Sequence, residues 1–298
     1  AYLPIQLVSA GIGAAFIRGK RGIADSLLTV VILFATGLVA LALGSVLFSV
    51  VTNGKAALKP HFLYENNVYV TTTTSLEYGG VGHAILGTIL TVGVTTLITV
   101  PLAVGVAVYL TESTGRLRGP VEFFAQALSG LPSVVSGLFI YAVFIATGLS
   151  RPAGWLGSAA LMFLMLPTVI RMSVEVLKLV PADLRSAALA LGAPRKNAFF
   201  QVILPAAKSG IITAVLLGVA RVVGETAPLL LVTRPTSNTN ANLFSGDMVT
   251  LPTYMFGFLT AGYDTGRARA WGSAFVLLIT VGILFALVRK FGSNEVKK

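Results

Sequence analysis

The sequence predicts an all-α integral membrane protein, a polytopic bundle of six core transmembrane helices. Hydrophobic residues make up 55% of the 298-residue chain and charged residues only 11%, with a mean hydropathy of +0.86. Soluble domains carry about 25% charged residues. Several apolar runs reach the roughly 20 residues that a helix needs to cross the hydrocarbon core, and alternating strands of about ten residues are not seen. The spans are therefore expected to be helices.

Six apolar runs are long enough to span the membrane, and they cover residues 26–51, 84–110, 121–147, 155–177, 209–233 and 271–288. Proline lies inside four of the runs, at Pro101, Pro132, Pro167 and Pro228. Neighbouring helices in a membrane can satisfy the backbone groups that a proline frees. We therefore expect kinks at these four positions and not helix ends.

Residues 1–25 form a separate N-terminal segment, in which an uncharged run over residues 1–17 precedes the basic turn 18–21. A signal peptide has its basic residues before the apolar run, and here they follow it. The segment is expected to be an extra partial span that enters from outside, with an interfacial helix as the alternative. Residues 26–298 are expected to form one transmembrane domain, because no repeat or long linker divides them.

Basic residues predict the orientation. Fifteen of the 22 Lys and Arg residues fall on the side that holds the basic turn and the loop 178–208, six fall on the opposite side, and Arg221 lies inside a span. The positive-inside rule places the basic turn, this loop and the C-terminus in the cytoplasm. The net charge of +11 thus has a topological cause and does not indicate nucleic-acid binding. The polar segments 52–83 and 234–270 are then external, as partner contacts or as solvated connections.

Covalent chemistry and metal binding are not expected of this chain. The absence of cysteine excludes disulfides, Cys-based zinc sites and thiol catalysis. His61 and His83 are expected to be surface or interfacial side chains and not metal ligands. The sequence contains no Gly-x4-Gly-Lys-Ser/Thr phosphate loop, so ATP hydrolysis by this chain is not expected.

The cytoplasmic loop 178–208 has the pattern of a helix, a tight turn and a second helix. Pro181 suits a first helical turn, Gly192 can close the helix in the left-handed conformation, and Pro194 can start the next helix, which Pro205 ends. The apolar residues recur at helical spacing, as Leu184, Ala187, Ala188 and Leu191. From the residues alone, this hairpin either docks a partner or packs against its own bundle.

The spacing of this loop resembles that of ABC importer permeases, which carry Glu-Ala-Ala, three residues, Gly, nine residues and Ile-x-Leu-Pro. This chain has Ser186-Ala187-Ala188, then Gly192, then Val202-Ile203-Leu204-Pro205. It departs from the pattern at Ser186 and Val202. The resemblance implies a coupling helix that sits in a groove of an ATP-hydrolysing subunit. The residues that it places there are Asp183, Leu184, Arg185, Ser186, Ala187, Ala188, Leu191, Gly192, Ala193, Pro194 and Arg195.

Two further segments, 220–228 with its Arg-x-x-Gly-Glu-Thr-Ala-Pro signature and 128–138, resemble phosphate-specific (Pst) permeases of the PstA type. The resemblance covers residues 79–289. It implies a type I ABC importer permease in a bacterial-type plasma membrane. The implied partners are a PstC-like second permease, two ATP-binding subunits that hold Mg-ATP, and an external phosphate-binding protein.

Charged residues inside the fifth span predict the transport site. An ionised side chain at a helix centre costs about 2.5 to 3.5 kcal/mol on insertion scales, so Arg221 and Glu225 are expected to face a polar path. The alternative is an intrahelical ion pair, because residues four apart share a helical face. Further hydroxyl contacts are expected from Thr226, Ser129, Ser133 and Ser136, unless these hydroxyls only bond their own backbone. Arg171 and Glu175 are expected to form an anchoring pair.

The function that the sequence predicts is therefore that of a permease subunit of an ATP-driven phosphate importer. Sulfate or molybdate is the nearest alternative substrate. A stand-alone secondary transporter would be expected to show inverted repeats or further ion-coupling residues in its spans, and neither is evident. A membrane scaffold would not require Arg221 or the cytoplasmic hairpin.

Overall fold

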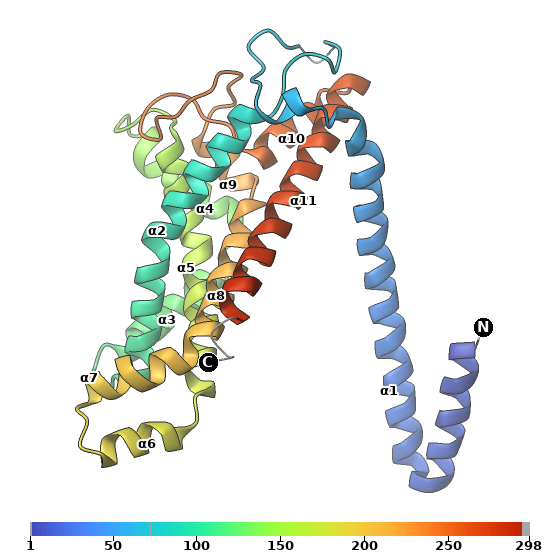
Figure 1. Ribbon diagram of the computed structural model, residues 1–298, viewed down its shortest axis with the longest axis vertical. Coiled ribbons are helices and arrows are strands. Elements are labelled where there is room, and N and C mark those ends of the chain that lie inside the picture. The colour runs from blue at the N-terminus through green and yellow to red at the C-terminus, as the bar shows by residue number, and fades with distance from the viewer. Residues whose placement is uncertain (1, 72, 294–298) are drawn as a thin grey trace. The chain divides into compact units, whose positions relative to one another are not determined.

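The computed structural model describes residues 2–71 and 73–293, and in this part of the chain every regular element is a helix (Figure 1). The all-α fold class is thus confirmed. The chain divides into two compact units, residues 1–53 and 54–298. The first unit is formed by α1 (Tyr2–Gly54), whose apolar part begins the candidate span Leu27–Ala57. Whether residues 1–17 cross the membrane stays a prediction, because the side chains of residues 1–24 lie outside the described part.

The second unit is a helical bundle. Its long helices are α2 (Gly82–Glu112), α5 (Gly154–Leu179), α8 (Leu204–Val223) and α11 (Asp264–Ser293). Its short helices are α3 (Arg118–Ser129), α4 (Ser133–Ile140), α6 (Ala182–Ala190), α7 (Arg195–Ala198), α9 (Ala227–Val232) and α10 (Leu251–Thr260). Two π-helical turns, Tyr141–Ile145 and Phe199–Ile203, extend α4 and join α7 to α8, and two 3-10 turns, Lys55–Ala57 and Pro60–Leu63, follow α1.

The six predicted spans all have counterparts among the described residues. Five are single helices, Leu27–Ala57, Gly82–Glu112, Gly154–Leu179, Arg195–Val223 and Asp264–Ala286. The third predicted span is instead a pair of helices bent by 105°. The fifth begins at Arg195, so the expected helix end at Pro205 is wrong. A π-helical turn precedes this proline, and such a wider turn accommodates a residue that cannot donate a backbone hydrogen bond.

The centre of the bundle is α5, which packs against α2 and α8 around a buried apolar cluster that includes Leu161, Met165 and Val222. Hydroxyl groups tie α5 to α2. The Ser158 hydroxyl donates to the Thr91 carbonyl at 3.0 Å, and the Thr95 hydroxyl donates to the Ser158 carbonyl at 3.2 Å. Small side chains allow this close approach of two backbones.

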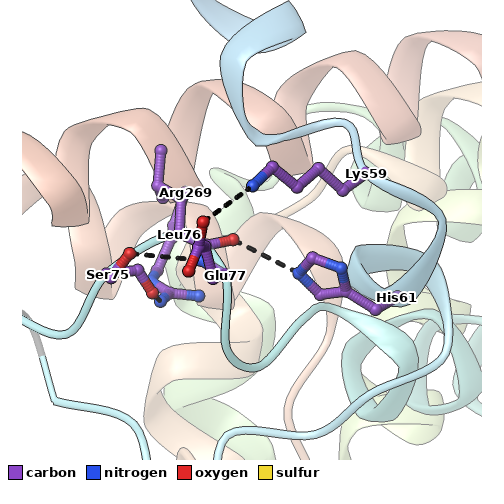
Figure 2. A network of polar contacts seen from close by, with 6 residues as sticks. All are labelled: Lys59, His61, Ser75, Leu76, Glu77 and Arg269. Carbon is purple, nitrogen blue, oxygen red and sulfur yellow. Dashed lines mark hydrogen bonds and ion pairs between the residues drawn. The ribbon is translucent and has the colours of Figure 1, made fainter.

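The end of the bundle opposite α6 carries an ordered loop between α1 and α2. Figure 2 shows how Arg269, which is fully buried, holds this loop to α11: its Nη2 donates to the Ser75 carbonyl at 2.8 Å. The same nitrogen donates to the carbonyls of Thr74 and Tyr78. His61 Nε2 lies 3.2 Å from the Leu76 carbonyl oxygen, so this histidine connects two parts of the same loop.

The segment 234–270 contains α10 and the first turns of α11, and whether it contacts a partner stays a prediction. One sequence expectation about this end is wrong. His83 is buried and packs edge-to-face on Tyr254 of α10, so it is neither a surface nor an interfacial side chain. Burial raises the pKa of the Tyr254 phenol to about 12, which keeps it neutral while it accepts a 2.8 Å hydrogen bond from Asn67. Tertiary contacts therefore stabilise α10.

Candidate translocation site

The bend in the third span separates two helices. α3 ends at Ser129 and α4 begins at Ser133, with Pro132 in an extended conformation between them. Proline has no N–H to continue a helix, and Gly130 lowers the helix propensity just before it. The expected kink at Pro132 is therefore a helix end, and the chain turns by 105° there.

The fifth span is interrupted as well. α8 ends at Val223, the residues Gly224 to Thr226 are not helical, and Pro228 lies in the first turn of α9. In a continuous helix the ring of Pro228 would clash with the carbonyl of Gly224, four residues earlier. The expected kink is again a helix end.

The helices that follow the two interruptions are in contact, because α4 packs directly against α9. A Cβ atom added at Gly137 of α4 would lie 2.6 Å from the Pro228 Cα and 2.7 Å from its carbonyl oxygen, so only glycine permits this approach. The two signature segments that the sequence singled out are therefore in backbone contact.

Arg221 lies in the last turn of α8 and points to α5. Its Nη1 donates to the Thr168 hydroxyl at 3.0 Å, and the side chain is exposed in the isolated chain. The intrahelical ion pair with Glu225 is wrong: Glu225 lies beyond the end of α8, and the described residues contain no ion pair between the two. Arg221 thus has a hydroxyl partner and no carboxylate partner in the described chain.

The remaining predicted side chains lie around the interruptions. Glu225 and Thr226 are half-buried between α8 and α9. Ser136 is buried and its hydroxyl donates to the Ser133 carbonyl at 2.7 Å, and the exposed Ser129 donates to the Ala125 carbonyl at 3.1 Å. The hydroxyls of Ser129 and Ser136 therefore bond the backbone of their own helices, which is the alternative that the sequence left open beside a contact in the transport path.

A polar cavity of about 420 Å³ lies between α3 and α5, and sequence reasoning missed it. Pro167 lines it, and the next residue is Thr168, the partner of Arg221. The polar residues that line the cavity are Glu122, Gln126, Ser129, Arg171, Glu175 and Lys178. Arg171 and Glu175 share this cavity, but no ion pair joins them in the described structure, so the anchoring pair is wrong. The sequence marked this part of α5 by Pro167, Arg171 and Glu175, but it did not indicate that they line a cavity with residues of α3.

The predicted cytoplasmic helix and turn are present as α6 and Gly192, whose φ of +81° is the left-handed conformation that favours glycine. Arg185 of α6 forms an ion pair with Glu112, the last residue of α2, with 2.6 Å between Nη2 and Oε1. Ala188 is buried, whereas Leu184 and Leu191 are 42% and 89% exposed. The helix thus presents leucine side chains to the surroundings.

The known proteins that this chain resembles are membrane components of transport systems. Residues 99–292 match the family described as binding-protein-dependent transport system inner membrane component. The phosphate transport system permease protein PstA 1 of Mycobacterium tuberculosis (strain CDC 1551 / Oshkosh) is 40% identical over 71% of this chain and 71% of its own length. PstA of Pasteurella multocida (strain Pm70) is 33% identical over 85% of this chain and 88% of its own.

Solved structures share the fold. A bacterial alginate ABC transporter in complex with an alginate pentasaccharide-bound periplasmic protein matches with a TM-score of 0.62 at 17% identity, over 92% of this chain and 98% of that chain. The MetNI methionine ABC transporter matches with a TM-score of 0.52 at 20% identity, over 73% and 93%. The spans and the family make the chain a multi-pass inner membrane protein. The chain belongs to the binding-protein-dependent transport system inner membrane component family, in its PstA group of phosphate transport system permeases.

Proposed function

We propose that this chain is the permease subunit of an ATP-driven phosphate importer and forms half of the translocation path. The names of the PstA relatives supply the substrate. The observation that carries the proposal is Arg221, a guanidinium at the interrupted end of α8 without a carboxylate partner in the described chain. An unpaired charge in a membrane span requires a polar surrounding, and a water-filled path that admits an anion supplies it.

Arg221 suits the task of contacting phosphate. A guanidinium stays charged at any working pH and can donate two parallel hydrogen bonds to a tetrahedral oxyanion. The Thr168 hydroxyl uses one of its donors and fixes its direction, so the other N–H groups are left for the substrate. Thr226 and the hydroxyls of Ser129, Ser133 and Ser136 are proposed as additional, weaker contacts, because their oxygens retain acceptor capacity for a protonated phosphate.

The test of this role is phosphate uptake by the reconstituted complex with Arg221→Ala. We expect uptake to be abolished while the complex still assembles and hydrolyses ATP at its basal rate. In the proposed mechanism Arg221 contacts the transported phosphate and neither the ATP site nor a partner subunit. Arg221→Lys is the matched variant, and it should retain only a small part of the uptake, since an ammonium cannot form the planar fork. Loss of assembly in both variants would show that Arg221 is structural.

Glu225 is proposed to favour phosphate over other oxyanions. A carboxylate repels anions, but it can accept a hydrogen bond from a protonated phosphate oxygen, which fully ionised sulfate does not offer. Glu225→Gln should therefore weaken the preference for phosphate in competition with sulfate and molybdate. Unchanged discrimination in this competition would remove Glu225 from the selectivity mechanism.

The chain itself is proposed to do no covalent chemistry and to hold no cofactor. ABC importer permeases work with ATPase and binding-protein partners, and we propose a PstC-like second permease, two ATP-binding subunits that hold Mg-ATP, and an external phosphate-binding protein. α6 with Gly192 and Pro194 is proposed as the element that docks the ATPase, because it exposes Leu184 and Leu191. A helix that docks the ATPase lies on the cytoplasmic side. We propose that the basic turn 18–21 and the C-terminus lie on the same side as α6, as the positive-inside rule predicts.

A further inference from the structure

A cup of about 710 Å³ opens at the end of the bundle opposite α6, between the loop that precedes α5 and the segment that joins α9 to α10. Its position follows from the chain, because Arg151 lies just before the first turn of α5 and α6 follows the other end of that helix. In the proposed orientation the cup is therefore external. The residues that line it include Arg151, Arg234, Phe244, Ser245 and Asp247.

The charges of the cup are unpaired. Arg151 and Arg234 are exposed, and within the described residues neither forms an ion pair, with Asp247 or with any other carboxylate. Two guanidinium groups against one carboxylate leave the cup with an excess of positive charge. Phe244 beside them is 74% exposed. Exposed aromatic and arginine side chains at one place are typical of the energetic centres of protein interfaces.

The backbone around the cup is held in place. Asn240 Nδ2 donates to the carbonyl oxygens of Ser245 at 2.9 Å and of Asp247 at 3.0 Å. The N–H of Trp155 donates to the Leu243 carbonyl at 2.9 Å, and the Leu243 side chain is buried. A surface that is ordered before binding loses less conformational entropy when a partner docks.

We propose that this cup docks an acidic surface of the external binding protein on which the transport system depends. The size of the cup decides against a free oxyanion: one water occupies about 30 Å³ of liquid, so a single phosphate would leave most of the space hydrated. Asp247 also repels a small dianion, whereas a protein surface can offer carboxylates to the arginines and a donor to Asp247. Arg–carboxylate pairs become strong when a partner excludes water from them.

The experiment measures ATP hydrolysis by the reconstituted complex as a function of binding-protein concentration at saturating phosphate. The double variant Arg151→Glu and Arg234→Glu should raise the half-saturating concentration of binding protein at least about tenfold. The half-saturating phosphate concentration, measured at saturating binding protein, should not change. Arg267→Glu is the matched control, because Arg267 is exposed near the same end, contacts Asp264 at 3.6 Å and lies outside the cup; it should shift the binding-protein curve less than about twofold.

If charge reversal prevents assembly of the complex, a second double variant without charge reversal tests the same proposal. Arg151→Gln with Arg234→Gln should raise the half-saturating concentration about threefold and flatten its dependence on ionic strength. An unchanged binding-protein curve in both double variants overturns the proposal, and a shift in the phosphate curve alone would assign the cup to a free oxyanion. The inference rests on the proposed function, yet the two can fail separately. Wild-type uptake reports the function, and direct binding of the binding protein to the complex reports the cup.

Discussion

Proline lies inside four spans of the bundle, but it interrupts only two of them. α2 and α5 contain Pro101 and Pro167 and run through them without interruption. The third and fifth spans contain Pro132 and Pro228, and in both a helix ends before the proline and a new helix begins at a residue next to it. Proline alone therefore does not interrupt a span of this protein.

Glycine and packing explain the difference. Gly130 and Gly224 are the first residues of the two interruptions, while the four residues before Pro101 and Pro167 are apolar residues or threonine, without glycine. An interruption in lipid leaves backbone groups without partners, which is costly unless protein covers them. α4 and α9 supply that cover by packing on each other, with Gly137 against Pro228. The continuous pair forms the scaffold, and Arg221 lies in the last turn before the interruption of the fifth span, where it reaches Thr168 of α5.

Gly137→Ala, compared with Gly105→Ala, tests whether the contact between α4 and α9 stabilises the interrupted spans. A Cβ at Gly137 meets the Pro228 backbone at 2.6 Å, so the variant should lower stability by about 2 kcal/mol or more. Gly105 of α2 has open space around a Cβ, and the same change there should be neutral or stabilise by about 0.5 to 1 kcal/mol. Thermal unfolding of the purified complex in detergent measures both. Equal melting temperatures for the two variants would show that the α4 and α9 contact is dispensable.

The sequence predicted where the spans lie but not where they break. Hydropathy alone locates a run such as 121–147, because most of its residues are apolar and Glu122 is its only charged residue. The break at Pro132 depends on whether another segment covers the freed backbone, and no local pattern carries that information. α10 was missed for a related reason. It is too short to cross the membrane, and Thr88 and Asn67, more than 160 residues earlier in the chain, bond Leu251 and Tyr254.

The site was predicted in part for the same reasons. Arg221 stood out because a cation in an apolar run is rare and costly. Its relation to Glu225 was wrong, since spacing predicts a shared face only in an unbroken helix. Thr168 was missed because a threonine in an apolar run most often bonds its own backbone, as Thr95 also does. Only the packing of α8 on α5 distinguishes the two threonines.

Thr168→Val against Thr95→Val sharpens that distinction between scaffold and site. Thr168→Val removes the acceptor of Arg221 and should lower phosphate uptake about three- to tenfold with little change in stability. Thr95→Val removes a hydrogen bond between α2 and α5 and should cost about 0.6 kcal/mol of stability with uptake intact. Uptake and thermal unfolding are measured on the same preparations. If the two variants lose uptake equally, Thr168 has no special relation to Arg221.

The smallest effect is expected where α6 meets the scaffold. The ion pair of Arg185 with Glu112 is 38% and 26% exposed, and pairs of this kind contribute about 0.2 to 1 kcal/mol. A double-mutant cycle with Arg185→Gln and Glu112→Gln should give a coupling energy in that range, measured by thermal unfolding of the complex. Arg116→Gln is the control, because Arg116 is exposed, follows Glu112 by four residues, and forms no ion pair among the described residues. If the pair fixes the angle of α6, both single variants should also reduce uptake per ATP hydrolysed, whereas Arg116→Gln should not. A coupling energy of zero with unchanged uptake per ATP would mean that α6 is positioned by its backbone connections to α5 and α7 alone.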